Sequence, residues 1–173
     1  MKTFIKLSLS LIILLVMLYP ASASSQLGWG QVSLTNKTAP DFELTTLDGS
    51  TKSFNNFRDG DNSIIFFWST WCPHCRSQLM ALLNMKEELE RKNIKVVLVN
   101  EGEKITVVSA FLEKNNIDFE VFFDTDGAIG SKYQVVGIPT FYFVDSAGIV
   151  KASEHYIPEN YGAFFASRKK NKK

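Results

Sequence analysis

The two cysteines of this 173-residue chain lie close together, in the stretch Trp71-Cys72-Pro73-His74-Cys75. Thiol-disulfide exchange requires one sulfur that attacks as a thiolate and a second sulfur close enough to displace it. An apolar run precedes the pair and a segment with helical spacing follows it, so we expect both cysteines on the first turn of a helix. There the unpaired N–H groups and the positive end of the helix dipole stabilise the thiolate of Cys72. The pattern therefore predicts a redox-active dithiol, with Cys72 as the nucleophile and Cys75 as the resolving thiol.

Three other uses of a Cys-x-x-Cys pair fit the sequence less well. A structural zinc site normally takes four protein ligands, and the histidines of the whole chain are His74 and His155. A c-type haem attachment places His directly after the second cysteine, where this chain has Arg76. A purely structural disulfide over so short a loop would remove little chain entropy. We therefore expect neither a metal ion nor a cofactor.

The composition predicts one packed domain with no affinity for nucleic acid. A chain of 173 residues that is 45% hydrophobic can bury a core without further disulfides. Its formal net charge of +1 gives no electrostatic argument for nucleic-acid binding. We expect a monomer whose partners are other proteins that carry thiols or disulfides.

The first 23 residues have the pattern of an export signal. Lys2 and Lys6 precede an apolar run over residues 7–19, and a small-residue site ends at Ala23. The run is shorter than the ~20 residues that span a bilayer. We predict a signal peptide that is cleaved after Ala23, with an uncleaved membrane anchor as the alternative. Either outcome places the remaining chain in the periplasm or at the outer face of the bacterial cytoplasmic membrane, where disulfides form.

Hydrophobic periodicity predicts that strands and helices alternate after a polar linker over residues 24–37. The predicted strands cover residues 39–45, 51–54, 63–69, 95–100, 119–123, 140–144 and 149–154. The predicted helices run from the cysteine motif to about residue 92, over 105–115 and 128–133, and from near 158, with 55–62 as a loop. Asp124 and Asp126 are expected to cap the short helix rather than to bind calcium. This order predicts an α/β domain over residues 38–167, followed by a basic, solvated tail over 168–173.

Several motifs together carry a resemblance to a known family. The Trp71–Cys75 stretch, followed later by Gly137-Ile138-Pro139-Thr140, resembles the thioredoxin fold. Other segments, in the same order, resemble the TlpA/ResA group of extracytoplasmic thiol-disulfide oxidoreductases over residues 38–165. These segments are Ala39-Pro40-Asp41-Phe42, Leu47-Asp48-Gly49, Phe67-Trp68-Ser69-Thr70-Trp71, Val99-Asn100, Gly102-Glu103 and Asp124-Thr125-Asp126.

The resemblance implies a thioredoxin-like fold, with a central mixed β-sheet, helices on both faces and an N-terminal β-hairpin extension. It implies that Pro139 follows a cis peptide bond beside the dithiol and that Ile138 presents its backbone to an extended substrate segment. Trp71 and Thr140 are expected to line the same substrate-binding surface. The family reduces disulfides in exported proteins, often apocytochrome c, and a reductase of this kind takes its electrons from a membrane dithiol carrier.

Two departures from the family pattern concern the proton that the resolving thiol must exchange. The ResA-type helix carries Glu three residues after the second cysteine, and this chain has Gln78 there. Thioredoxin proper has a buried Asp on the strand before the motif, and Phe66 takes that place here. With neither carboxylate present, the sequence does not identify the group that trades protons with Cys75.

A third departure concerns the direction of electron flow. The dipeptide Pro73-His74 matches the DsbA oxidases, in which the imidazole stabilises the attacking thiolate and makes the pair a stronger oxidant. The scaffold favours a reductase, with Pro73 and His74 as site residues beside the cysteines. A DsbA-like disulfide-forming oxidase is the first alternative. A His74 that only caps the helix or faces solvent is a second interpretation of that residue.

Two further hypotheses use the same fold differently. A copper-delivery module could combine Cys72, Cys75 and His155, although such proteins typically space their cysteines by three residues. Peroxide reduction is suggested by the Ala39–Phe42 opening, which recurs in peroxiredoxins. Those enzymes place Thr three residues before the reactive cysteine, whereas Thr70 is two residues before Cys72.

Overall fold

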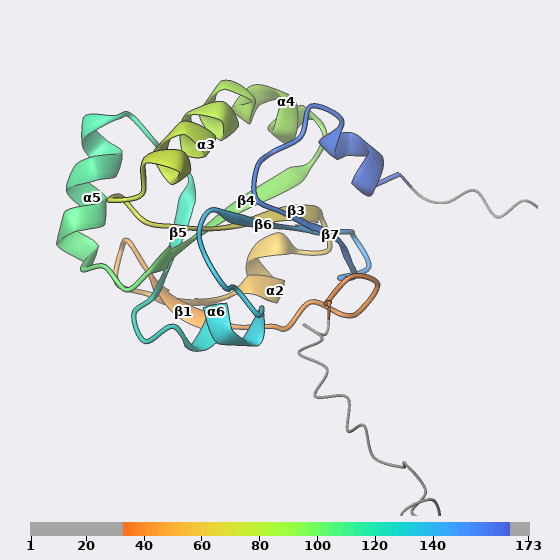
Figure 1. Cartoon of the computed structure of the whole chain (residues 1–173), viewed down its shortest axis with the longest axis horizontal. Helices are drawn as coiled ribbons and strands as arrows, with labels where there is room; N and C mark the ends of the chain where they lie inside the picture. The colour runs from red at the N-terminus through yellow and green to blue at the C-terminus, as the bar shows by residue number, and fades with distance from the viewer. Residues whose placement is uncertain (1–32, 167–173) are drawn as a thin grey trace, which may run out of the picture. The chain divides into compact units, whose positions relative to one another are not determined.

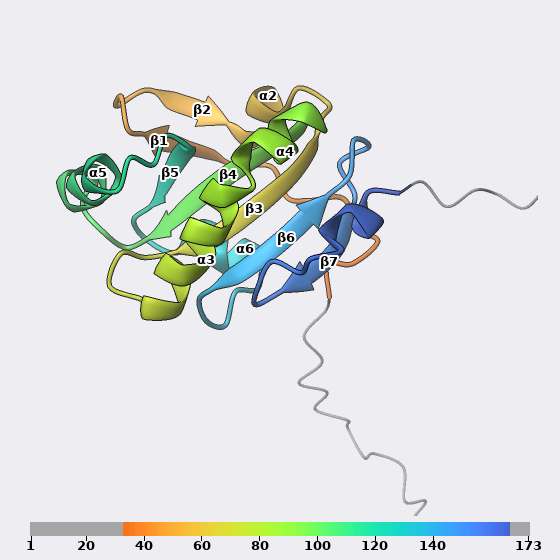
Figure 2. The ribbon, with the colours of Figure 1, turned by 90° about the horizontal axis from the view of Figure 1, so that it is seen from above.

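A seven-stranded mixed β-sheet forms the centre of the protein in the computed structural model, which describes residues 33–166. The strand order is β2-β1-β5-β4-β3-β6-β7, and the sheet is seen nearly edge-on in Figure 1 and from above, with all seven strands labelled, in Figure 2. Strands β3, β4 and β5 run parallel to one another, and β6, β7, β1 and β2 join antiparallel at the two sides. The strand bounds are β1 Glu43–Thr46, β2 Thr51–Ser53, β3 Asn62–Trp68, β4 Ile94–Glu101, β5 Glu120–Asp124, β6 Thr140–Val144 and β7 Val150–Glu154.

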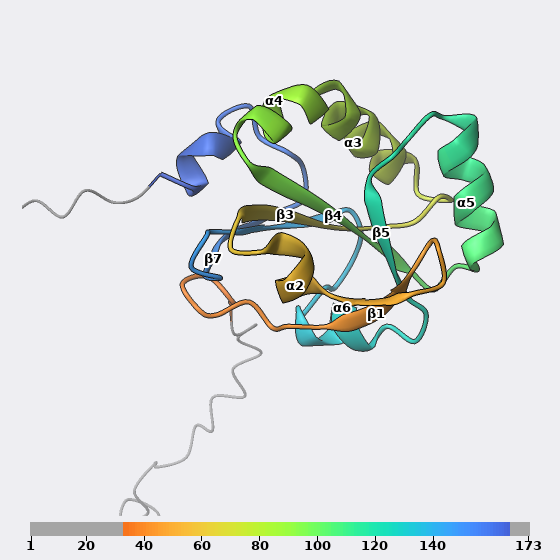
Figure 3. The same cartoon turned by 180° about the vertical axis from the view of Figure 1, so that it is seen from behind.

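Helices cover both faces of this sheet, as the sequence predicts for a central run of parallel strands. The helices are α2 Phe54–Arg58, α3 Pro73–Asn84, α4 Lys86–Arg91, α5 Ile105–Lys114, α6 Ala128–Lys132 and the 3₁₀ helix η1 Tyr161–Phe164. Leucines of α3 and α4 pack with Val108 of α5 and Tyr161 of η1 in one core cluster. Phe54 of α2, Ile129 of α6 and Tyr133, which directly follows α6, pack in a second cluster. Figures 1 and 3 show α3 and α4 on one face of the sheet and α2 and α6 on the other.

The central strand β3 divides its side chains between the two clusters. Phe66 and Trp68 are fully buried on the α3 face, while Ile65 and Phe67 are fully buried on the α6 face. This alternation is the period of two that a β-strand imposes, and burial of both faces explains the uninterrupted apolar run. Phe66 stacks on Phe141 of β6 with ring centroids 4.2 Å apart. Both cysteines belong to the same core cluster as Phe66 and Trp68.

The predicted N-terminal hairpin is confirmed and is part of the main sheet. Strand β1 pairs with β2, and its other edge pairs with β5. Just before the hairpin, Asn36 N–H donates to the carbonyl of Val150 at 2.7 Å, and Lys37 accepts from Val150 N–H. The last residues of the predicted linker therefore lie against β7, within the folded part of the chain.

The segment over residues 55–62 was predicted as a loop, and this prediction is wrong at its start. Helix α2 occupies Phe54–Arg58, and the hydroxyl of Ser53 caps it by accepting from Asn56 N–H at 3.3 Å. Phe54 is fully buried and stacks on Phe42. The helix is too short to show periodicity in sequence, and burial of one aromatic ring together with a single cap stabilises it.

The remaining differences lie at helix ends. The helix predicted to continue to about residue 92 is divided at Met85 into α3 and α4. Glu87 and Glu88 lie in the first turn of α4, where the positive end of a helix dipole favours acids. The last predicted helix is the single 3₁₀ turn η1, which begins at Tyr161 rather than near Pro158.

The predicted caps of the short helix are confirmed. The carboxylate of Asp124 accepts from the N–H groups of Ile129 and Gly130, and Asp126 accepts from Ala128 N–H. These bonds pair the free donors in the first turn of α6.

The predicted signal peptide or anchor, the start of the linker and the basic tail over residues 168–173 lie outside the described residues. Within residues 33–166, no helix combines the length and the apolar character needed to cross a membrane.

Candidate active site

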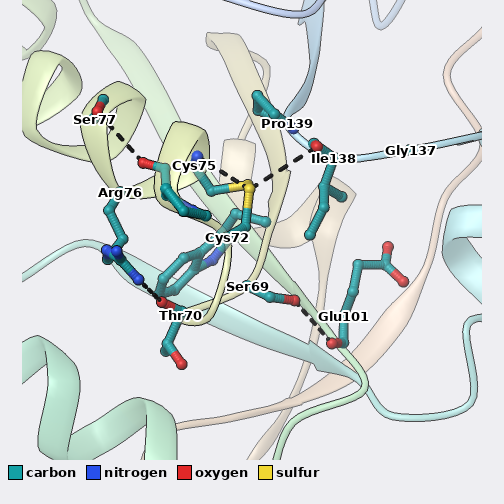
Figure 4. The surroundings of a disulfide bond; sticks show 12 residues. Ser69, Thr70, Cys72, Cys75, Arg76, Ser77, Glu101, Gly137, Ile138 and Pro139 are labelled. Carbon is teal, nitrogen blue, oxygen red and sulfur yellow. Dashed lines mark hydrogen bonds between the residues drawn. A yellow bond between two sulfur atoms is a disulfide. The ribbon is translucent and has the colours of Figure 1, made fainter.

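The cysteine pair lies at the N-terminus of α3, where the sequence places it. Pro73 occupies the first helical turn, whose backbone N–H groups have no partner within the helix, and Cys72 is the N-cap residue. A disulfide joins Cys72 to Cys75, with their Cα atoms 5.2 Å apart (Figure 4). The N–H of Cys75 donates to the sulfur of Cys72 at 3.2 Å. After reduction this N–H and the helix dipole both stabilise the thiolate of Cys72.

The two sulfurs differ in their access to solvent. Cys72 is 5% exposed and Cys75 is fully buried in the core. This order agrees with Cys72 as the attacking sulfur, because a partner protein can reach it first. Pro73 and His74, between them, are both exposed.

The loop before β6 brings a backbone acceptor to the first sulfur. The Ile138–Pro139 peptide bond is cis, as the resemblance implies. The sulfur of Cys72 lies 3.9 Å from the carbonyl oxygen of Ile138 (Figure 4). A disulfide sulfur carries no proton, so this contact becomes a hydrogen bond when Cys72 is a thiol. Thr140 is buried, and its hydroxyl holds the loop by donating to the carbonyl of Gly137 at 2.6 Å.

The two tryptophans near the motif have different surroundings. Trp68 is fully buried and packs against Phe111 of α5. Trp71 is 66% exposed directly before Cys72. An aromatic side chain that remains this exposed beside a reactive sulfur is suited to contact a partner protein.

A carboxylate that the sequence-based reasoning gave no role holds the loop between β3 and α3. Glu103 accepts from the N–H of Thr70 at 2.7 Å and from its hydroxyl at 2.5 Å. The side-chain amide of Asn100 also donates to Glu103, at 2.8 Å. From the other side, Arg76 of α3 donates to the carbonyl of Thr70 (Figure 4). These bonds fix Thr70, which lies two residues before Cys72. The Val99-Asn100 and Gly102-Glu103 motifs therefore have a structural role, because Asn100 and Glu103 hold the loop that leads to the cysteines.

A second acid, Glu101, ends β4 next to the motif. The hydroxyl of Ser69 donates to its backbone carbonyl at 3.0 Å. Burial, and then the nearby charge of Asp124, raise the pKa of Glu101 to about 7. Its Oε1 atom is buried without a hydrogen-bond partner among the described residues, and a methyl group built on Gly130 would come within 2.8 Å of that atom. The signal in the sequence is an acid that directly follows the run over residues 96–100 at the end of a mostly apolar strand.

The raised pKa predicts that Glu101 makes stability depend on pH. The folded protein holds a proton on Glu101 that the unfolded chain releases above about pH 4.5, so its contribution to stability is lost as pH rises toward 7. We expect Glu101→Gln to stabilise the protein at pH 8 by about 1–2 kcal/mol, allowing for partial solvent contact, and to change little at pH 4. Urea denaturation at both pH values measures this difference.

The control for this prediction is Glu159→Gln, at an exposed glutamate. It removes the same charge without removing a buried carboxylate, so its effect should stay within about 0.5 kcal/mol at both pH values. Equal effects of Glu101→Gln on stability at pH 4 and pH 8 would contradict the prediction, because they would show that the Glu101 carboxyl has the same pKa in the folded protein as in the unfolded chain.

Phe66 and Gln78 occupy the two positions where related proteins carry an acid. Phe66 is fully buried and stacked, so β3 offers no acid under the cysteines. Gln78 faces the segment after β7, where its side-chain oxygen accepts from Ile157 N–H at 2.8 Å. This long-range bond, between residues far apart in the chain, has no local signature in the sequence.

The copper hypothesis receives no support from the geometry. Within residues 33–166, no three or more His, Cys, Asp or Glu side chains are placed so that they could share a metal ion. His155 instead contacts the backbone of the loop that contains Pro139, through its Nδ1 atom at 2.8 Å from the Pro139 carbonyl.

The fold and the site together define a thioredoxin-like protein with a Cys-x-x-Cys disulfide at a helix N-terminus and a cis proline facing it. The chain belongs to the AhpC/TSA family, whose model matches residues 35–153. It is 30% identical over 114 residues to thiol-disulfide oxidoreductase ResA of Geobacillus kaustophilus, covering 66% of this chain and 65% of that protein. It is 34% identical over 116 residues to thioredoxin-like protein YneN of Bacillus subtilis, covering 65% and 66%.

A solved structure extends this similarity to the fold. The structure described as a putative thiol:disulfide interchange protein DsbE from Chlorobium tepidum matches with a TM-score of 0.67 and 28% identity. The match covers 75% of this chain and 91% of that one. The chain spans just under two thirds of the length of the ResA protein that it matches, so the similarity concerns the thioredoxin-like part.

Proposed function

We propose that this protein is an extracytoplasmic thiol-disulfide oxidoreductase that reduces disulfides in exported proteins. The observation that carries the proposal is the Cys72–Cys75 disulfide at the N-terminus of α3, with the Ile138 carbonyl 3.9 Å from the outer sulfur. This arrangement combines an activated nucleophile, a buried resolving partner and a backbone edge for an extended substrate. The names of the ResA and DsbE relatives support the same chemistry.

The reaction needs no cofactor, because the two sulfurs carry the electrons. The Cys72 thiolate attacks a substrate disulfide, forms a mixed disulfide and releases one substrate thiolate, which takes up a proton. The Cys75 thiol loses its proton, attacks the Cys72 sulfur and releases the second substrate thiolate. The net step converts one substrate disulfide to two thiols and leaves the Cys72–Cys75 disulfide. A membrane dithiol carrier then returns two electrons and two protons.

Several finer assignments belong to this proposal. Residues 1–23 export the chain or anchor it, residues 24–37 form the linker and its docked end, and residues 38–167 form the working domain, followed by the basic tail. The site comprises Cys72, Cys75, Pro73 and His74. Trp71, Ile138 and Pro139 contact the substrate, and the buried Thr140, for which the sequence predicts the same role, supports this surface by holding the loop. Apocytochrome c before haem attachment is the proposed substrate, and the protein acts as a monomer in the periplasm or at the outer face of the cytoplasmic membrane.

The reduction potential of the Cys72/Cys75 couple tests the direction of the reaction. We expect a value below about −220 mV, which gives the dithiol enough reducing power for a reductase. A value above about −180 mV would reject the reductase direction, and one near −120 mV would favour the DsbA-like alternative that the Pro73-His74 dipeptide suggests. Equilibration with glutathione or dithiothreitol buffers, followed by alkylation of free thiols, measures it.

A peroxide-consumption assay on the reduced protein tests the class of reaction. We expect the protein to reduce the disulfides of a test protein and to consume hydrogen peroxide no faster than a free dithiol. Fast peroxide consumption with slow disulfide reduction would contradict the proposal and support the peroxidase hypothesis.

A further inference from the structure

A pocket of about 460 Å³ lies beside the cysteine motif. His74 and Gln78 of α3 form one wall, residues 136–139 of the cis-proline loop form the second, and His155 and Tyr156 after β7 form the third. Val136 and Tyr156 at its rim are 76% and 57% exposed. Because His74 and Pro139 both belong to the site, a substrate held by Cys72 would have its neighbouring side chains next to this pocket.

One hydrogen bond of Gln78 fixes which atom of its side-chain amide is the oxygen. The N–H of Ile157 donates at 2.8 Å to the side-chain atom assigned as Oε1. A backbone N–H needs an acceptor, so the partner must be the amide oxygen and not the nitrogen. The Nε2 group of Gln78 is therefore left as a donor on a side chain that lines the pocket.

The hydrogen bonds of His155 fix its tautomer in the same way. Its Nδ1 atom lies 2.8 Å from the carbonyl oxygen of Pro139 and 3.3 Å from the hydroxyl oxygen of Thr140. The Thr140 hydroxyl already donates to Gly137, so it accepts here, as the carbonyl does. Two acceptors require a proton on Nδ1. In the neutral imidazole, Nε2 is then an acceptor.

The geometry points to a specificity pocket that takes a carboxamide side chain, Gln or Asn, next to the reactive cysteine of the substrate. A carboxamide accepts from Gln78 Nε2–H and donates to His155 Nε2 at the same time. A carboxylate would place an acceptor against the acceptor Nε2 of His155, and an ammonium would place a donor against the donor Nε2–H of Gln78. An alkyl group forms a hydrogen bond with neither. The apolar rim covers the stem of the substrate side chain. This inference rests on the proposed function and names which of its substrates react fastest.

The test uses short peptides closed by one disulfide, with Gln, Glu, Lys or Ala next to the cysteine on either side. The fully reduced wild-type protein reduces each peptide at pH 8, where histidines are generally neutral. Each rate is divided by the rate with dithiothreitol, which removes the intrinsic reactivity of the peptide disulfide. We expect the Gln peptide to react about five- to tenfold faster than the Ala, Glu and Lys peptides, at one or both flanking positions.

The variant Gln78→Glu changes the chemistry of one wall and keeps the fold. A carboxylate oxygen still accepts from Ile157 N–H, but the donor toward the pocket becomes an acceptor. We expect the preference to move from the Gln peptide to the Lys peptide. Asn56→Asp adds the same charge at an exposed site on α2, on the opposite face of the sheet, and should keep the preference for Gln.

The outcomes separate this inference from the function on which it rests. If wild type reduces all four peptides at normalised rates within about twofold of one another, the pocket does not select the side chain and the inference is wrong, while the function stands. If it reduces none of them faster than free dithiothreitol, the proposed function itself fails. Should Gln78→Glu not fold, the wild-type comparison alone decides the question.

Discussion

Cys72→Ser is expected to lower the rate of reduction of a protein disulfide such as insulin by more than about a thousandfold. A serine hydroxyl does not ionise near neutral pH, so the helix N-terminus and the N–H of Cys75 have no anion to stabilise. Cys75→Ser is expected to retain attack and to lose resolution. It should therefore accumulate one stable mixed disulfide per molecule, visible as a mass shift that dithiothreitol reverses.

The two cysteine variants control for each other, because each makes the same small change in the same core cluster. Similar unfolding temperatures would show that the difference between them is chemical. Full turnover by Cys72→Ser would contradict the assignment of the nucleophile. Accumulation of the mixed disulfide in Cys72→Ser instead of Cys75→Ser would reverse the two roles.

Glu103→Ala is expected to destabilise the protein by about 2–4 kcal/mol and to slow disulfide exchange by about tenfold or more. The substitution removes the acceptor of three hydrogen bonds, from the N–H and hydroxyl of Thr70 and from the amide of Asn100. Asn100 is fully buried, so its amide would be left without that partner. Thr70 would lose its attachment to the segment that follows β4, and the position of Cys72 relative to Ile138 would become less well defined.

Glu113→Ala, at an exposed position of α5, is the matched control and should change stability by less than about 0.5 kcal/mol. Glu103→Gln keeps an acceptor for Thr70 N–H and should fall between wild type and Glu103→Ala. Denaturant unfolding gives the stability, and insulin reduction at a temperature where all variants are folded gives the rate. If Glu103→Ala is destabilised but exchanges disulfides at the wild-type rate, the hydrogen bonds of Glu103 contribute to stability and do not position the cysteines.

The chemistry and the broad fold could be predicted from the sequence, because both have local or periodic signals. Cys72 and Cys75 are separated by a spacing that fits one helical turn, and Pro73 is suited to the first helical position. The apolar strands β3 and β4 are separated by a helical segment, an order that is typical of a parallel crossover. Ile138-Pro139 and its neighbours supplied the family resemblance. These features depend on residues close together in the chain.

Only the tertiary structure decided which groups surround the dithiol. Glu103 reaches Thr70 from the segment after β4, Gln78 bonds to Ile157, and His155 bonds to the loop of Pro139, each between residues far apart in the sequence. Glu101 acquires its high pKa from burial beside Asp124, which no local pattern reports. Hydrogen-bond partners and burial depend on how distant segments pack, whereas helical spacing and strand alternation are set by the backbone itself.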